Sequence, residues 1–312
     1  MIFNKNLAIV VPTYNREQIL RVWFESHAQL LFSKKIRIHI QDNNSTDGTK
    51  KLLKEWKKRF KNISFAINKK NLLNKNCEIA INSLDAKFIW TVGDTYAFDI
   101  EIINKIISII KKRSPLFILI NLKGRVKKIE EKYVSANFVC QKLSGIMSCI
   151  SCIIYNKAKL KKIIFREFLW SSFPHTIYLL NQLKLKNQKA YWVPLSINSL
   201  KLKTPHNNWS TTSDVFKIGC KGWIDSIDSL SNFSVISKKK AYRLFSDATN
   251  LFSWKGGLWL RSQGLLTIDK IKDYKIYLNK SVGKKYFILY FIALLPIFPL
   301  KVLKIMYQCS KK

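Results

Sequence analysis

Two short segments near the start of the chain constrain its fold more than any other part of the sequence. In each, an apolar run that can form a strand ends in polar, turn-forming residues: residues 8–17 read AIVVPTYNRE and residues 40–49 read IQDNNSTDGT. A helix-like segment separates them. Strand, helix and strand in this order form a βαβ unit, whose ligand lies at the carboxyl ends of the strands. The sequence therefore predicts a binding site built from these two turns.

Strands and helices continue to alternate through the first third of the chain. The patterns predict strands over residues 7–12, 36–42, 63–67 and 88–92, and helices over 16–31, 49–56 and 76–84. Asp47 is placed to cap the helix that starts at Thr49. This alternation indicates an α/β fold with a mostly parallel sheet.

The second half of the chain is less regular. We expect a helix over 101–112, strands over 116–121 and 147–155, a helix opening at 171–175, a polar acceptor loop over 200–235 and a helix over 238–263. Cys149 and Cys152 form a CxxC pair inside the apolar run 146–154. With no second CxxC and no His-x-His partner, we interpret them as packing residues of a buried strand and not as zinc ligands.

Charge is the unusual feature of the composition. The chain has 312 residues, and its 55 basic and 19 acidic side chains give a net charge of +36. Apolar residues make up 47%, which excludes a disordered chain. Such a basic protein favours polyanions, and no nucleic-acid-binding module is recognisable in the sequence. We therefore expect contact with phosphate groups or an anionic membrane surface, and no nucleic acid.

The two ends of the chain also carry information. Residues 1–6 lead directly into the first predicted strand, so we expect no cleavable signal sequence. Residues 286–300 are almost wholly apolar and are flanked by lysines, but Pro296 and Pro299 interrupt them. The run is too short to cross a bilayer, so it predicts an interfacial membrane anchor; a C-terminal helix packed on the domain is the alternative.

The two turn segments resemble the nucleotide-binding half of family 2 glycosyltransferases, which have the GT-A fold. The resemblance rests on VVPTYNR and DNNSTDGT at the spacing typical of that family. It implies that the base and ribose of a sugar nucleotide bind to residues at the ends of the first two strands, namely Pro12, Thr13, Tyr14, Arg16 and Asp42. One departure lies at Leu73, where the family often has a glycine before an asparagine.

The metal-binding motif of the family is reduced in this chain. Gly93-Asp94 stands where relatives carry a run of aspartates that binds Mg²⁺ or Mn²⁺, but Thr95 and Tyr96 replace the next carboxylates. Hard divalent ions prefer carboxylate oxygens, which leaves Asp94 as the metal ligand, with Asp99 further along. Three interpretations stay open: a divalent cation held by Asp94 with water and phosphate, a basic side chain in place of the metal, or impaired catalysis.

Two side chains are candidates for the catalytic base. The resemblance implies a carboxylate in the second half of the domain, and Glu167 is the only one between Lys132 and Ser213. His175 ends the segment Phe173-Pro174-His175, which resembles a segment found in the abequosyltransferase-like branch of the family. In the first turn of a helix, the dipole would favour its neutral imidazole. A capping or packing role for His175 is the alternative.

Together these features predict an inverting glycosyltransferase with the GT-A fold. Residues 1–235 would form the catalytic domain, with a nucleotide half over about 1–100 and an acceptor half over about 101–235; residues 236–312 would form a helical extension with a membrane-associating segment over 286–307. The expected donor is a nucleotide sugar, and the expected acceptor is a polyprenyl-diphosphate-linked saccharide. The resemblance implies bacterial O-antigen or capsule synthesis at the cytoplasmic face of the inner membrane. The alternative is a GT-A scaffold with impaired catalysis that acts as an assembly partner.

Overall fold

The computed structural model describes residues 4–123, 125–200, 202 and 209–309. The chain folds into two compact units. The first comprises Met1–Val139, Cys149–Trp170 and Pro174–Thr204; the second comprises Cys140–Ser148, Ser171–Phe173 and Pro205–Lys312. The expected division was at residue 235, whereas the second unit also takes in earlier residues, because its helix α9 (Trp223–Asp228) packs on α10 (Val235–Thr249).

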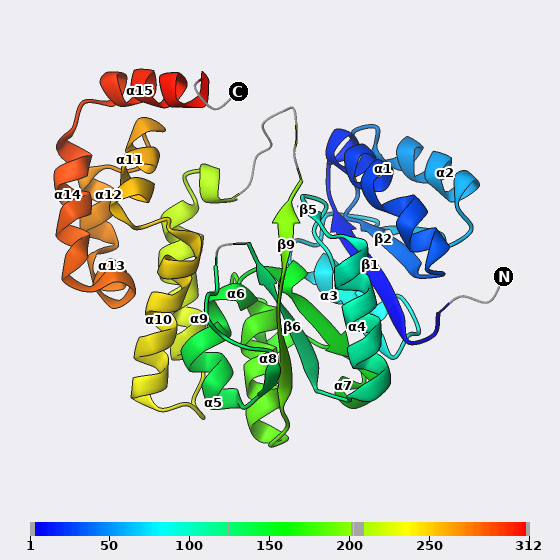
Figure 1. Ribbon diagram of the computed structural model, residues 1–312. Helices are drawn as coiled ribbons and strands as arrows, with labels where there is room; N and C mark the ends of the chain where they lie inside the picture. Colours follow the sequence, from blue (N-terminus) through cyan, green and yellow to red (C-terminus); the bar gives the residue numbers. More distant parts are fainter. Residues whose placement is uncertain (1–3, 124, 201, 203–208, 310–312) are drawn as a thin grey trace. The chain divides into compact units, whose positions relative to one another are not determined.

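The first unit alternates strands and helices, as Figure 1 shows in blue to green. Its elements are β1 (Leu7–Thr13), α1 (Glu17–Ser33), β2 (Arg37–Asp42), α2 (Thr49–Arg59), β3 (Ile63–Ile67), α3 (Lys75–Asn82), β4 (Phe88–Thr91), β5 (Tyr96–Ala97), α4 (Ile100–Lys112), β6 (Phe117–Leu122), β7 (Lys132–Val134), α5 (Ala136–Phe138), β8 (Ile153–Asn156), α7 (Lys157–Leu160), α8 (Pro174–Leu185) and β9 (Ala190–Ser199). The described residues form one nine-stranded sheet in the order β3-β2-β1-β4-β8-β6-β9-β5, with β7 beside β9.

Most strands of this sheet run in the same direction. β1 pairs in parallel with β2 and β4, β2 with β3, and β6 with β9. β8 is antiparallel to both β4 and β6, so those two strands share a direction. The short strands β5 and β7 are antiparallel to β9, so they too run against the main direction. The expectation of a mostly parallel α/β sheet is therefore confirmed. Parallel strands covered on both faces need apolar side chains at successive positions, as in β1 and β6.

The structure corrects the predicted strand over residues 147–155. Only Ile153–Asn156 is extended, as β8, while Ser144–Met147 is helical and Ile150–Cys152 forms a 3₁₀ turn. An apolar run of this length fits a buried strand or a buried helical turn equally well, so periodicity alone could not separate them. The CxxC pair lies in the turn, with the Cys152 N–H donating to the Cys149 carbonyl at 3.0 Å.

The second unit is helical. Its elements are α6 (Ser144–Met147), a π-helical turn (Lys217–Gly222), α9 (Trp223–Asp228), α10 (Val235–Thr249), α11 (Trp254–Ser262), α12 (Ile268–Asp273), α13 (Lys275–Val282), α14 (Tyr286–Leu294) and α15 (Ile297–Cys309). The expected polar loop over 200–235 is thus wrong for 217–228, whose Cys220, Trp223 and Ile227 are buried. Residues 201 and 203–208 lie outside the described part. The expected helix over 238–263 is two helices, separated at Asn250 in the left-handed region.

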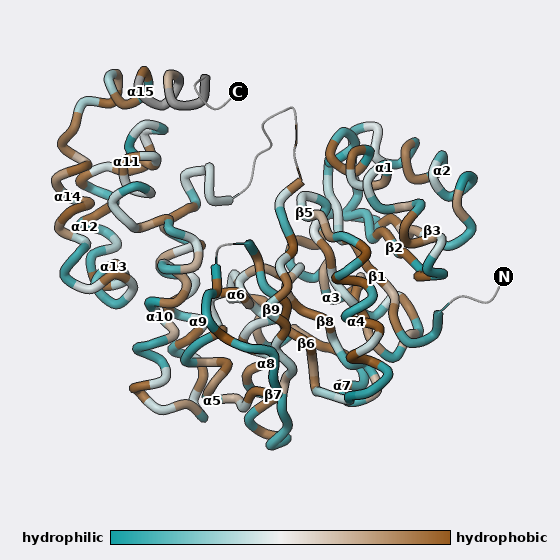
Figure 2. The backbone as a smooth tube through the Cα atoms, in the orientation of Figure 1, coloured by the Kyte–Doolittle hydropathy of each residue, from teal (hydrophilic) through white to brown (hydrophobic). Residues whose placement is uncertain are grey.

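The apolar tail forms two helices and not one. α14 ends where Leu295 is extended before Pro296, whereas Pro299 lies in the first turn of α15, where proline is tolerated. α14 buries Leu289 and Ile292 but exposes Phe287, Ile288, Phe291 and Leu294. In Figure 2 the backbone of α14 is coloured mostly as hydrophobic. Among the described residues, no helix has the length and apolarity needed to cross a membrane.

Candidate active site

The turn after β1 adopts a conformation that asparagine tolerates. Asn15 has φ of 51°, in the left-handed region where Asn is several-fold enriched among non-glycine residues. Its N–H donates to Ser45 Oγ at 2.8 Å, and its side-chain oxygen accepts from the Thr46 N–H at 2.8 Å. The turn after β1 is therefore fixed directly to the turn after β2, although the two are far apart in the sequence.

Asp47 strengthens the same connection. Its carboxylate accepts from the Glu17 N–H at 3.1 Å and from the Thr49 N–H at 3.0 Å, at the starts of α1 and α2. These are backbone groups that no turn of the helix can satisfy. The predicted role of Asp47 at the start of α2 is confirmed, although Gly48 occupies the N-cap position, and the same side chain also serves α1.

Asp42 ends β2 and is fully buried, with 0% of its surface exposed. Ser45 donates to it from the side-chain hydroxyl and from the backbone N–H, the latter at 3.2 Å. Burial raises the pKa of Asp42 above its ordinary value, because the Ser45 hydrogen bonds and the Lys50 charge offset only part of the desolvation. A carboxylate oxygen accepts hydrogen bonds only, so at this place it selects ligand N–H or O–H groups.

Asp94 follows β4 and lies beside the end of β1. The Thr13 hydroxyl donates to Asp94 Oδ2 at 3.1 Å, and Thr13 is the register partner of Asp42. Thr13 therefore lies between the two carboxylates at the carboxyl ends of three neighbouring strands. Burial raises the pKa of Asp94 to about 6, against the lowering effects of the Arg16 charge and the Thr13 hydrogen bond. The structure thus brings together Thr13, Arg16, Asp42 and Asp94.

The residues around Asp94 limit how a divalent ion could bind. Among the described residues, no group of three or more His, Cys, Asp or Glu could hold a metal. Asp99 instead caps α4, where its Oδ1 accepts from the Ile102 N–H at 3.0 Å. Mg²⁺ is commonly held by one or two carboxylates together with substrate phosphates. Asp94 fits that arrangement, in which the ligand supplies most of the oxygens.

A cluster of polar side chains that the sequence did not reveal includes Tyr96, two residues after Asp94. Hydrogen bonds join Cys149 to Tyr96 and Cys152, and the Arg125 guanidinium is close enough to act on all three by its charge. The hydrogen bond to Cys152 lowers the pKa of Cys149 to about 6 against burial. Arg125 Nη1 is buried with no hydrogen-bond partner among the described residues. Arg125 follows no motif, so only the fold could place it.

The comparison with known families agrees with this geometry. A family model described as Glycosyl transferase family 2 matches residues 8–164, half of the chain. The chain belongs to glycosyl transferase family 2. Abequosyltransferase RfbV of Salmonella typhimurium is 22% identical over 200 residues, which cover 56% of this chain and 60% of that protein. The chain therefore spans less than two thirds of this relative, and the predicted resemblance to the abequosyltransferase branch is confirmed.

Solved structures share the fold. Staphylococcus aureus TarS 1–349 in complex with UDP-GlcNAc aligns with a TM-score of 0.56 at 18% identity, covering 98% of this chain and 92% of that one. The mannosyltransferase PcManGT from Pyrobaculum calidifontis, in complex with GDP-Man and Mn²⁺, aligns with a TM-score of 0.56 at 11% identity, covering 94% and 87%. At these identities the likeness shows the fold alone, and it confirms the GT-A prediction.

Leu73, a departure from the expected family pattern, has an unusual backbone conformation. This residue stands where family members often have glycine, and its φ is 49°, a conformation that glycine adopts without strain. Its side chain is 77% exposed. Asn43 holds the segment in place: its side-chain oxygen accepts from the Leu72 N–H at 2.8 Å, and its amide donates to Asn71 at 2.7 Å. Leu73 therefore has a backbone conformation that suits glycine, and Asn43 holds the segment in that shape.

The remaining predicted residues lie at different depths in the first unit. Pro12 and Arg16 are half-buried, and Tyr14 is 42% exposed, so its ring is accessible to a ligand. His175 is buried in the first turn of α8, and Glu167 is exposed in a 3₁₀ turn over Arg166–Phe168. In the described part of the chain, the hydrogen bonds and charges found at Asp94 come from Thr13 and Arg16. The catalytic base therefore stays a prediction.

Proposed function

We propose that this chain transfers one sugar from a nucleotide-sugar donor to a lipid-linked saccharide acceptor in bacterial surface polysaccharide synthesis. The observation that carries the proposal is the meeting of Thr13, Asp42 and Asp94 at the ends of three neighbouring strands. The relation to an abequosyltransferase supports the class of reaction, and the TarS complex with UDP-GlcNAc shows a protein of this fold with such a donor.

Each residue of the cradle would make a different contact with the donor. Tyr14 offers an exposed ring for the base, and Asp42 accepts hydrogen bonds from base or ribose. Arg16 places a positive charge near Asp94, where the donor diphosphate would lie. A divalent cation held by Asp94 and the diphosphate would stabilise the negative charge that develops on the leaving group.

The reaction would be a displacement at the anomeric carbon with inversion. An acceptor hydroxyl attacks that carbon, the bond to the donor diphosphate breaks, and the nucleoside diphosphate leaves with the electron pair. The hydroxyl proton passes to a general base, which we assign to His175 or Glu167. Since Glu167 is exposed and His175 is buried, Glu167→Gln and His175→Gln tested singly would distinguish them by which one loses turnover.

Membrane contact is proposed for the C-terminal helices. Phe287, Phe291 and Phe298 belong to a set of exposed large apolar side chains on α14 and α15, and Lys284 and Lys285 precede them. Exposed apolar surface next to lysines suits the boundary between lipid headgroups and acyl chains. This supports a peripheral location on the cytoplasmic face of the inner membrane, where a polyprenyl-diphosphate acceptor would be available.

The test is nucleotide binding and donor turnover. Titration with UDP, GDP, CDP and TDP, with and without Mn²⁺, should show one nucleotide whose affinity rises with the ion. Absence of saturable binding of any of the four would contradict the proposal.

A second candidate, a scaffold with impaired catalysis, is favoured by Thr95 and Tyr96, which stand where the resemblance implies further carboxylates after Asp94. It predicts nucleotide binding without ion-dependent transfer or donor hydrolysis. A measured ion-dependent release of nucleoside diphosphate from the donor would exclude it.

A further inference from the structure

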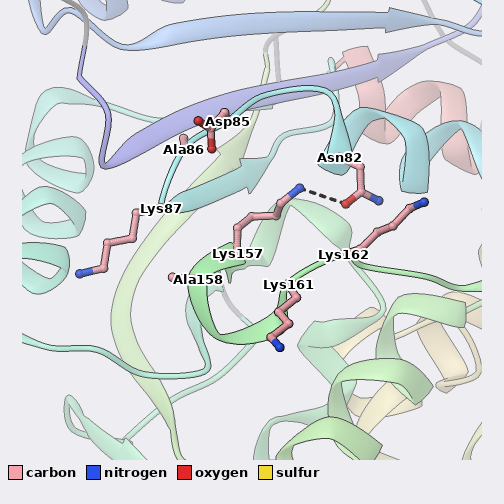
Figure 3. A pocket seen from close by; sticks show the side chains of 8 residues that line it. All are labelled: Asn82, Asp85, Ala86, Lys87, Lys157, Ala158, Lys161 and Lys162. Atoms are coloured by element: carbon pink, nitrogen blue, oxygen red, sulfur yellow. Dashed lines mark hydrogen bonds between the residues drawn. The ribbon is translucent and has the colours of Figure 1, made fainter.

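A lysine-rich pocket lies at the amino end of β4, whereas the proposed active site lies at the carboxyl end of that strand. Figure 3 shows the side chains that line the pocket. Its volume is about 470 Å³, within the range of small-ligand sites. Lys87 precedes β4 and Lys157 follows β8, and these two strands are antiparallel, so both residues lie at the amino end of β4. Asp94 follows the other end of β4. The lining residues are Asn82, Asp85, Ala86, Lys87, Lys157, Ala158, Lys161 and Lys162.

The charge of this lysine pocket is strongly unbalanced. Four lysines and one aspartate line it, which leaves three positive charges in excess. In the part of the chain that the structure describes, none of the four lysines forms an ion pair within 4.0 Å; the ion pairs found there involve other residues. Lys87, Lys161 and Lys162 are exposed, and Figure 3 shows their side chains pointing in different directions. Because these side chains are long and flexible, they can turn towards an anion.

Lys157 is the anchored member of the set. Its Nζ donates to Asn82 Oδ1 at 3.0 Å and to the Ile81 carbonyl at 3.4 Å, which fixes the direction of its side chain. Burial lowers its pKa, and the Asp85 charge opposes that effect only in part. Bringing a second anion next to Lys157 would therefore compensate a charge that the fold leaves undercompensated.

The backbone at Lys161 gives a second, independent observation. Its φ is 57° with ψ of −128°, a region that glycine adopts freely and other residues rarely occupy. A lysine there costs conformational energy and returns no hydrogen bond or ion pair from its side chain within the described residues. Residues held in such sparsely populated backbone conformations cluster at active sites and ligand-binding segments.

We propose that this lysine pocket is a non-catalytic binding site for phosphate groups. Lysine ammonium groups bind phosphate as point charges. A single phosphate group brings about two negative charges, and a diphosphate comes closer to matching the excess of three. Two sources share this chemistry: a soluble phosphorylated compound and the headgroup of an anionic phospholipid. The site is separate from the donor cradle and does not depend on the proposed glycosyl transfer.

The first measurement is the protection of individual lysines. Amine acetylation of the full chain, followed by peptide mass spectrometry, is run with and without pyrophosphate in the absence of divalent ions. The site predicts slower modification of Lys87, Lys161 and Lys162 with added pyrophosphate, and an unchanged rate at Lys51, Lys54 and Lys58 on α2. Equal protection of both sets would mean that pyrophosphate only screens the surface, and it would overturn the proposal.

Matched variants test the same point by affinity. Lys87→Ala, Lys161→Gly and Lys162→Ala together should weaken pyrophosphate binding about tenfold in calorimetry, as expected for three exposed charges. Lys51→Ala, Lys54→Ala and Lys58→Ala together remove the same charge from exposed positions and should leave the affinity within about twofold. If both triple variants weaken binding equally, the pocket is not a site.

Removing the one carboxylate of the pocket should act in the opposite direction. Asp85→Asn keeps the shape of the side chain and its backbone carbonyl, which accepts from Arg37. Pyrophosphate affinity should rise about threefold, since a nearby like charge is lost. An affinity that is unchanged or falls would contradict the assignment.

Vesicle sedimentation distinguishes the two sources. Vesicles of phosphatidylglycerol with phosphatidylcholine are compared with phosphatidylcholine alone, using the pocket triple variant and its α2 control. If the pocket variant alone loses vesicle binding, the ligand is a lipid headgroup. If it loses only pyrophosphate binding, the ligand is soluble. If it loses neither, the proposal fails.

Discussion

In the first unit, the carboxyl ends and the amino ends of the parallel strands carry opposite charges in opposite environments. They are called here the carboxyl edge and the amino edge of the sheet. At the carboxyl edge, Asp42 and Asp94 are buried and hydrogen-bonded to Ser45 and Thr13. At the amino edge, the lysine pocket is open to solvent, and no carboxylate lies within ion-pair distance of its lysines in the described residues. The strand β4 links the two sites, because Lys87 precedes it and Asp94 follows it.

The difference shows how the same sheet can bind anions in two ways. Buried carboxylates repel a diphosphate unless a cation accompanies it, so binding at the carboxyl edge should depend on a divalent ion and on pH. Exposed ammonium groups attract phosphate directly, so phosphate binding at the amino edge should depend on ionic strength and should need no divalent cation. The following predictions test this contrast.

The largest expected effect comes from removing the carboxylate of Asp94. Asp94→Asn should lower donor turnover by about 100-fold or more, because the ion would lose its protein ligand at the leaving group. The Mn²⁺ dependence of nucleotide affinity should disappear in calorimetry, while pyrophosphate binding at the lysine pocket stays unchanged.

Asp99→Asn is the matched control for Asp94→Asn. Asp99 caps α4 through its side chain, and asparagine is an equally good cap. Turnover and ion dependence should therefore stay near those of the wild type. If Asp99→Asn abolished ion dependence and Asp94→Asn did not, the metal assignment would move to Asp99.

The second prediction concerns stability and pH without any divalent ion. The folded pKa of Asp94 is about 6 against an ordinary value of 3.8, so the folded state binds more protons than the unfolded state between these values. Stability is therefore lost as pH rises through this window, by about 3 kcal/mol at most. Asp94→Asn removes this cost, because the amide carries no charge.

Urea denaturation in EDTA would measure the effect. The free energy of unfolding of Asp94→Asn should exceed that of the wild type by about 2–3 kcal/mol at pH 7.5 and converge with it below pH 4. A constant difference across pH would show that packing, and not ionisation, separates the two proteins. A variant less stable than the wild type at pH 7.5 would contradict the raised pKa.

Much of the carboxyl edge could be predicted from the sequence, because its signals are local. The strands β1 to β4 were placed within two residues, since each is an apolar run that ends in turn residues. That Thr13 and Asp42 lie close together follows from the βαβ unit, because they end two neighbouring parallel strands. The link between Thr13 and Asp94 adds only the neighbouring position of β4.

The amino edge could not be predicted, because it depends on contacts between distant segments. Lys87 and Lys157 meet only because β8 inserts antiparallel beside β4. The same insertion was hidden by the apolar run that includes Cys149, which fits a strand and a helical turn equally well. Arg125 was missed for a similar reason, since a basic residue in a basic chain carries no positional signal.

The third prediction concerns the hydroxyl between the two carboxylates. Thr13→Val keeps the branched shape and removes the donor to Asp94 Oδ2, a charge-assisted hydrogen bond of about 1.5–3 kcal/mol. Ion-dependent nucleotide affinity should fall about tenfold, and the pH below which that affinity is lost should rise. Thr13→Ser restores the hydroxyl and should restore the pH profile. If valine and serine behaved alike, the hydroxyl would have no part in the site.

The smallest expected effect compares two strained backbones, one at each edge. Leu73 at the carboxyl edge and Lys161 at the amino edge have φ of 49° and 57°. Replacing either with glycine should raise the free energy of unfolding by up to about 1 kcal/mol, because relief of the left-handed strain exceeds the entropy that glycine adds to the unfolded chain. Urea denaturation of both variants would measure these changes.

The two glycine variants should then differ in ligand binding. Lys161→Gly should weaken pyrophosphate binding about threefold despite the more stable fold, since it removes one exposed charge from the pocket. Leu73→Gly should leave the affinities for the nucleotide and for pyrophosphate unchanged, because the exposed leucine side chain has no hydrogen-bonding group. Equal affinity losses in the two variants would show that backbone relaxation, and not the lysine charge, controls anion binding at the amino edge.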